Sequence, residues 1–116
     1  SVIGGGDPLA MFQGFMLDIR KGAFGTSALQ LTDWQATTSK TVGPLTPALN
    51  LNWYSIDLTS SKLYVNKAAT GSGLTQIRLR FKLDDDNNPI ANYLNLYSGN
   101  AALAYRPRLI VEYYVP

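Results

Sequence analysis

The most constraining feature of this chain is a strict alternation of apolar and polar residues between positions 75 and 82. Every second side chain is apolar, and those between are polar or charged: Gln76, Ile77, Arg78, Leu79, Arg80, Phe81 and Lys82. A period of two places the two sets on opposite faces of a β-strand. The stretch therefore predicts a strand with one buried face and one face that carries cations.

A second alternating run follows after a turn. Leu94 and Leu96 alternate with Tyr93, Asn95 and Tyr97, and the connection is rich in Asp, Asn and Pro, which favour turns. The two runs together predict an antiparallel hairpin. If the apolar faces pair, the opposite face carries cations beside tyrosines and an amide.

That polar face is a candidate ligand-binding site. Its members would be Arg78, Arg80, Lys82, Tyr93, Asn95 and Tyr97. Alternate side chains along a strand lie about 7 Å apart, close to the repeat of a sugar polymer, and guanidinium groups bind carboxylates bidentately. Because tyrosine rings can stack on sugar faces, these residues suit an acidic polysaccharide such as a uronate polymer. The alternative is that the charges keep the outer face of the strand soluble while the tyrosines cover their aliphatic stems.

The turn between the two runs is a candidate calcium site. Carboxylate and amide oxygens are the ligands that calcium prefers, and four consecutive residues supply them: Asp84, Asp85, Asp86 and Asn87. Asp33 or Asp57 could add further oxygens if the loops converge. The spacing differs from that of an EF-hand, and the alternative is a solvated turn in which Asp and Asn bond their own backbone.

Composition excludes several classes of function. The 116 residues contain no Cys and no His, so thiol nucleophiles and histidine-based acid–base catalysis cannot arise within this chain. The carboxylates Asp33, Asp57 and Glu112 show no spacing that selects a catalytic pair. A net charge of +2 is too small to indicate nucleic acid as a partner. We therefore expect a non-catalytic protein.

The remaining pattern predicts an all-β fold. Further short apolar runs, at residues 13–20, 53–58 and 107–115, are separated by Gly, Pro, Ser, Thr and Asn, with little sign of helix. Neither a repeat nor a linker divides residues 1–116, so we expect one β-sandwich module. Trp34 and Trp53 can be core or loop-anchoring residues, or platforms for a ligand. No apolar run reaches the roughly 20 residues of a membrane-spanning helix.

Six stretches of the chain resemble a known family. They are residues 18–25, 29–36, 53–55, 73–81, 97–100 and 106–113, of which the Tyr-Ser-Gly turn and the closing Arg-Pro-Arg-Leu strand are the more specific. Together they resemble the C-terminal part of DNRLRE-type domains, which are related to the disaggregatase repeat and to a family of carbohydrate-binding modules. The resemblance implies an antiparallel jelly-roll-like sandwich from a large secreted bacterial or archaeal surface protein, hence an extracellular location.

The resemblance also implies that strands are missing. Such domains begin with several further strands upstream, where this chain has only a Gly-rich start. A sheet without its partner strands exposes backbone groups that proteins normally cover. We therefore expect a partner strand, either from an upstream domain of the same precursor or from an identical subunit; the alternative is that the sandwich closes by itself. The first functional hypothesis is a carbohydrate-binding module, and the second is a cell-surface, adhesin or filament subunit that assembles by β-strand complementation.

Overall fold

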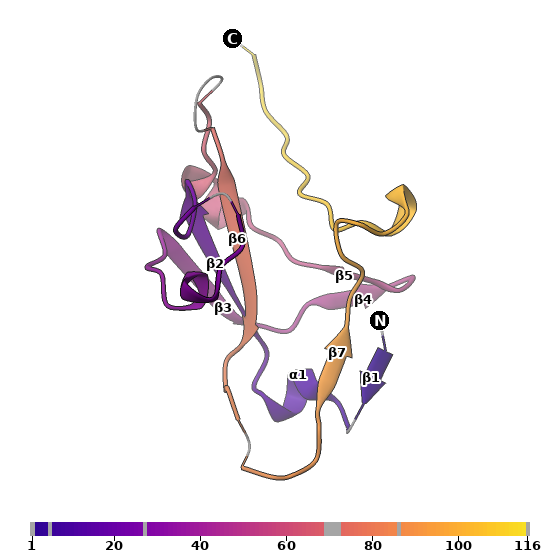
Figure 1. Ribbon diagram of the computed structural model, residues 1–116. Coiled ribbons are helices and arrows are strands. Elements are labelled where there is room, and N and C mark those ends of the chain that lie inside the picture. The colour runs from indigo at the N-terminus through magenta and orange to yellow at the C-terminus, as the bar shows by residue number, and fades with distance from the viewer. Residues whose placement is uncertain (1, 5, 27, 69–72, 86, 116) are drawn as a thin grey trace.

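The computed structural model describes residues 2–4, 6–26, 28–68, 73–85 and 87–115, and its regular structure is mostly β (Figure 1). Helical structure in these residues is limited to one turn of α-helix, α1 (Pro8–Met11), and three 3₁₀ helices, η1 (Leu31–Trp34), η2 (Thr59–Tyr64) and η3 (Leu103–Tyr105). The prediction of an all-β chain is confirmed at this level.

The strands of the described residues form three antiparallel sheets. The largest has the order β3-β2-β6, built from β3 (Lys40–Leu45), β2 (Phe15–Lys21) and β6 (Thr75–Phe81). Two-stranded sheets join β1 (Val2–Gly4) to β7 (Tyr93–Asn95) and β4 (Ala48–Asn50) to β5 (Trp53–Ser55). The finer expectation of a jelly-roll-like sandwich stays a prediction, as does the single module over residues 1–116.

The predicted hairpin is wrong. β6 pairs with β2 rather than with β7, and β7 pairs with β1 near the start of the chain. Figure 1 shows β6 and β7 on separate arms joined by a long loop. Alternation fixes the face on which each side chain lies but says nothing about which strand is the neighbour.

The core lies on one face of β2. Phe15, Leu17 and Ile19 occupy alternate positions of this strand and are buried. The register places Leu17 opposite Leu79 and Ile19 opposite Ile77, so the apolar row continues onto β6. The predicted apolar face of residues 75–82 thus lies on the side of the buried row of β2, but its burial is only partial: Leu79 and Phe81 are half-buried and Ile77 is 42 % exposed.

Glycine allows β2 and β3 to approach closely at one end. Gly14 has a φ of +87°, and a Cβ there would lie 2.7 Å from the carbonyl oxygen of Leu45. Gly43 has a φ of +132°, and a Cβ there would lie 2.6 Å from the carbonyl oxygen of Phe15. Side chains at these positions would be both strained and in collision, so the junction of β2 with β3 requires glycine.

Residues 107–115, which we call the tail, were predicted to form the closing strand. They lie outside every sheet of the described structure, and their side chains are exposed, with Tyr114 100 % exposed. The base of the tail is held by Arg106, whose Nε donates to the Ala101 carbonyl at 2.7 Å, and by Arg108, whose guanidinium lies 5.2 Å from the centre of the Trp53 ring. Beyond that point the tail runs as a separate trace through residue 115 (Figure 1).

Candidate functional site at the outer edge of β6

A buried carboxylate organises the polar face of the central sheet. Asp18 lies between Leu17 and Ile19 in sequence but points to the opposite face, where its side chain is 0 % exposed. The register places it across from Thr41 on β3 and Arg78 on β6. The Thr41 hydroxyl donates to Asp18 at 2.6 Å, Arg78 donates through Nε and Nη2 at 2.9 and 2.7 Å, and Arg80 donates through Nε at 3.0 Å.

These donors decide the protonation of Asp18. Burial by itself raises the pKa of a carboxyl group, but the hydrogen bonds from Thr41, Arg78 and Arg80 outweigh it, so that the pKa of Asp18 is lowered from its ordinary value. The carboxylate is therefore ionised at neutral pH. It binds two guanidinium groups, which leaves the cluster with an excess of one positive charge.

Arg78 fastens a loop onto the sheet. Its Nη1 donates to the backbone carbonyls of Asp33, Trp34 and Ala36, and its guanidinium lies 4.6 Å from the centre of the Phe24 ring. Only 11 % of its side chain is exposed. These contacts assign Arg78 to holding η1 in place, and they leave little of it accessible to an external ligand.

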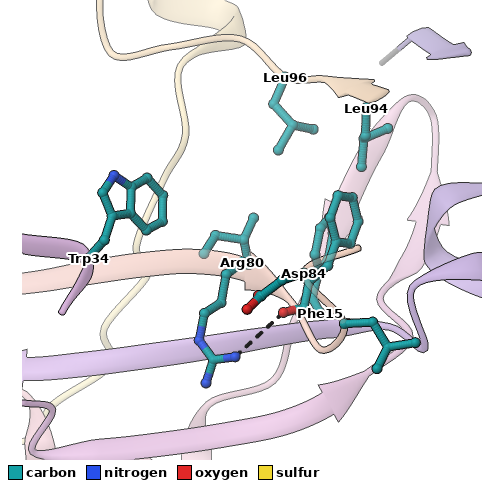
Figure 2. Close-up of a pocket in the computed structure, with 9 residues that line it drawn as sticks. Phe15, Trp34, Arg80, Asp84, Leu94 and Leu96 are labelled. Carbon is teal, nitrogen blue, oxygen red and sulfur yellow. Dashed lines mark hydrogen bonds between the residues drawn. The ribbon is translucent and has the colours of Figure 1, made fainter. Parts of the chain in front are cut away.

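The other predicted cations are more accessible but also have protein partners. Arg80 is 36 % exposed, and besides its bond to Asp18 its Nη1 donates to the Phe81 carbonyl at 3.5 Å (Figure 2). Lys82 Nζ donates to the side chain of Gln13 at 2.8 Å. Arg78 and Arg80 thus lie on β6 and Lys82 directly follows it, each with a partner.

The predicted aromatic half of the ligand face lies on a different sheet. Tyr93 and Asn95 belong to β7, which pairs with β1, and the ring of Tyr97 stacks on Tyr105 with 4.9 Å between centroids. The structure therefore does not bring these residues together with the cations on one hairpin. Their binding role stays a prediction.

The predicted calcium residues lie in the loop after β6. Asp85 Oδ1 accepts the backbone N–H of Asn87 at 2.8 Å, which is the local turn expected of Asp and Asn. Asp84 lines the groove described below, and Asp86 lies outside the described residues. Among the residues that are described, no three acidic side chains cluster in a way that could hold a metal. Asp33 and Asp57 do not join this loop in such a cluster, and calcium binding stays a prediction.

Two adjoining hollows run along the outer edge of β6. The first, of about 360 Å³, is lined by Phe15, Trp34, Leu79, Arg80, Phe81, Leu83, Asp84, Leu94 and Leu96. The second, of about 440 Å³, is lined by Phe24, Leu29, Asp33, Trp34, Thr75, Gln76, Ile77, Arg78 and Leu79. Both linings include side chains from the two faces of β6, so the hollows straddle the edge of the strand. We call the two together the edge groove.

Trp34 and β7 form opposite walls of the first hollow. Figure 2 shows the Trp34 indole on one side, Leu94 and Leu96 on the other, and Arg80 and Asp84 between them. Trp34 is 58 % exposed, although its backbone is fixed by Arg78. In the second hollow Asp33 is buried, and its Oδ1 has no hydrogen-bond partner among the described residues. The first hollow thus offers an aromatic platform and a partly exposed cation, whereas the unpartnered Asp33 oxygen is buried beneath the surface.

One edge of β6 directs backbone groups away from β2 and toward this groove. The N–H of Gly22 donates to Leu74 at 2.9 Å and that of Lys82 donates to Gly14 at 3.0 Å. Both bonds join residues that lie directly opposite each other, and the positions next to β6 that take part, Leu74 and Lys82, are even-numbered. Because such hydrogen-bonded pairs recur at every second position of an antiparallel ladder, the backbone groups of the even-numbered residues of β6 face β2. Ile77 and Leu79 therefore direct their N–H and C=O groups outward, where no further strand of the described structure covers them.

Sequence interpretation missed both the edge groove and Asp18. The groove combines side chains from β2, η1, β6, β7 and two loops, and no local pattern brings these together. The buried carboxylate could have been predicted from the sequence. Asp18 is a lone acid inside the apolar run of residues 15–19, and an acid that is buried must be paired.

Among the described residues no helix has both the length and the apolar character needed to cross a membrane.

Comparisons with other proteins do not assign this chain to a family. No protein-family model matches the chain, and neither the curated proteins nor the solved structures give a significant match.

Proposed function

We propose that this chain is a non-catalytic structural module of a secreted or cell-surface assembly, and that identical subunits join by β-strand complementation. The observation that carries this proposal is the tail. Leu109, Val111 and Tyr113 are exposed apolar residues at alternate positions of an extended segment, and no strand of the described structure pairs with it. A segment of this kind is a ready donor for an exposed sheet edge.

The wider surface supports assembly. Large apolar side chains are exposed well beyond the tail, including Leu29, Leu31 and Leu103. Extensive exposed apolar surface marks sites of association with another protein. Strands added from other subunits would also widen the three-stranded sheet toward the size that a jelly-roll-like sandwich needs. The resemblance to DNRLRE-type surface proteins fits an extracellular structural role.

The test is the molar mass of the purified chain as a function of concentration. Light scattering after size-exclusion chromatography should show multiples of the 12.7 kDa monomer that grow with concentration. Val111→Asp with Tyr113→Asp should remain monomeric, because charges on the apolar face of the tail cannot be buried against a second sheet. Both side chains are exposed in the monomer, so its stability should not change.

The matched control places two aspartates at exposed apolar positions outside the tail, Leu51 and Leu63. This variant should assemble like the original chain. A compact monomer at every concentration would refute the proposal. If the tail variant assembles as well as the original chain, the tail is not the donor strand.

Carbohydrate binding is the second candidate function, and the edge groove is the observation that favours it. A sugar ring could stack on Trp34, while Arg80 lines the same hollow and could meet a uronate carboxylate. Of the predicted ligand residues, Arg80 is the one that this groove retains in an accessible position.

For this second function we expect Trp34→Ala to weaken binding of alginate about tenfold, the loss that corresponds to one aromatic stacking contact. Trp53→Ala is the control, because Trp53 lies under Arg108 and outside the groove. Affinity electrophoresis in gels containing alginate would measure both. Absence of binding by the original chain, or an equal loss in both variants, would exclude the groove as a glycan site.

A further inference from the structure

We infer that the outer edge of β6 is the acceptor for this assembly, and that it takes the tail of a second copy as an added antiparallel strand with Glu112 beside Arg80. This inference rests on the proposed function and specifies its acceptor site. It follows from the backbone of the edge, the side-chain pattern of the tail and the charges of both.

At the outer edge of β6, the residues whose backbone groups point outward are the same residues that carry the apolar side chains. Ile77 and Leu79 direct their backbone groups outward, and their side chains lie on the same face as the buried residues of β2. An added strand would therefore form its direct hydrogen-bonded pairs with these residues. Residues directly opposite one another share a face, so the partners of Ile77 and Leu79 must be apolar.

The tail has the matching pattern. Leu109, Val111, Tyr113 and Val115 lie on one face of an extended chain, and Ile110, Glu112 and Tyr114 lie on the other. Placing the first set opposite the apolar row of β6 puts Glu112 on the face that carries the cations. Antiparallel pairing is the orientation of every sheet in the described structure.

Charge selects the register. Glu112 is the one carboxylate in the tail, and the cluster on β6 has two guanidinium groups for the single carboxylate of Asp18. Arg80 is the more exposed of the two, so it is the arginine that an incoming carboxylate can reach. With Glu112 across from Arg80, Tyr113 lies across from Leu79 and Val115 across from Ile77.

The occupant is a second copy because the tail of the same chain is directed elsewhere. Arg106 and Arg108 hold its base against residues 101–104 and Trp53, and the described residues beyond them belong to no sheet. Figure 1 shows the tail leaving the region of η3 as a separate extended trace. Donor and acceptor are thus both open in one subunit.

Disulfide crosslinking tests the register directly, because the chain contains no Cys of its own. A subunit with Ile77→Cys is mixed with a subunit with Val115→Cys and oxidised under mild conditions. Directly hydrogen-bonded partners have Cα atoms about 5.5 Å apart, inside the usual disulfide range of about 4.4–6.8 Å. We expect a covalent dimer of the two different chains. The control pairs Ile77→Cys with Tyr114→Cys, whose side chain lies on the opposite face, and should give little product.

A proline pair tests the backbone contacts. Val111→Pro removes an N–H that faces β6 in this arrangement and should raise the concentration required for assembly at least about tenfold. Ile110→Pro removes an N–H that faces away and should have a much smaller effect, since Pro is tolerated at the solvent side of an edge strand.

The outcomes separate this inference from the proposed function. If the original chain assembles but both crosslinks form equally, or neither forms and both proline variants assemble normally, another surface is the acceptor and this inference is wrong. Sensitivity to Ile110→Pro in place of Val111→Pro would also overturn it, because that pattern requires a parallel strand. A chain that remains monomeric would refute the proposed function itself. Crosslinking to an upstream segment of the same precursor, where that segment is present, would replace the second copy as the occupant.

Discussion

Asp18→Asn is expected to lower the free energy of unfolding by about 3–5 kcal/mol, the cost of breaking a buried ion pair by removing one partner. The substitution preserves the shape of the side chain but removes its charge. Arg78 and Arg80 are then left beside a neutral amide, and the Thr41 hydroxyl loses a charged acceptor. Urea unfolding followed by the fluorescence of Trp34 and Trp53 would measure the change.

Asp85→Asn is the matched control, because Asp85 is exposed and its contact to the Asn87 N–H needs only an oxygen that Asn also has. Its effect should stay within about 0.5 kcal/mol.

The pH dependence of folding stability gives a second measure of the contribution of Asp18. Because the pKa of Asp18 is lower in the folded state than its ordinary value of 3.8, its stabilising effect is present above about pH 4 and is lost as the pH falls through the folded pKa. Asp18→Asn should remove this part of the loss of stability at low pH. If the variant has the same stability as the original chain, and loses it at low pH in the same way, the cluster does not support the sheet.

Ile19→Ala is expected to cost about 2–5 kcal/mol, through lost apolar burial and the cavity left behind. Ile19 is 2 % exposed at the centre of the apolar face of β2, across from Ile77. The small buried core leaves little else to compensate, since many of the large apolar side chains of this chain are exposed.

Ile90→Ala removes the same atoms from a position that is 63 % exposed, in the loop after β6. It should change stability by less than about 0.5 kcal/mol. Thermal unfolding monitored by circular dichroism would compare the two variants. Similar losses in both would mean that assembly, rather than the face of β2, buries the apolar surface that matters for stability.

The sequence predicted on which face of a strand each side chain lies better than it predicted which strands pair. Strand β6 and its apolar face follow from local alternation, and so does β2, because side chains at successive positions must point to opposite sides. The pairing of β6 with β2 depends on contacts across about sixty residues, such as Arg78 with Asp18. The turn-rich loop after Lys82 favoured a local hairpin, but it serves as a long connection to β7.

The candidate site shows the same division. Alternation placed Arg78 and Arg80 on one face, where both bind Asp18, but it could not show that a carboxylate from another strand neutralises part of that face. The short strand β1 in the Gly-rich start was not expected either, because glycine lowers strand propensity and only pairing with β7 stabilises it there. The tail has the pattern of a strand but lacks a neighbour in the described structure, which is information that a periodic pattern does not contain.

The position of Asp18 also has a consequence for the order in which the sheet folds. Its contact to Thr41 spans 23 residues, whereas its contacts to Arg78 and Arg80 span 60 and 62 residues. Closing the longer loop costs more chain entropy and is slower. Until β6 docks, a partly formed pair of β2 and β3 would have to keep this carboxylate hydrated, which opposes burial of that face. Arrival of β6 supplies the counter-charges and the rest of the apolar row in one step, so the buried acid makes formation of the three-stranded sheet a cooperative event rather than a stepwise addition of strands.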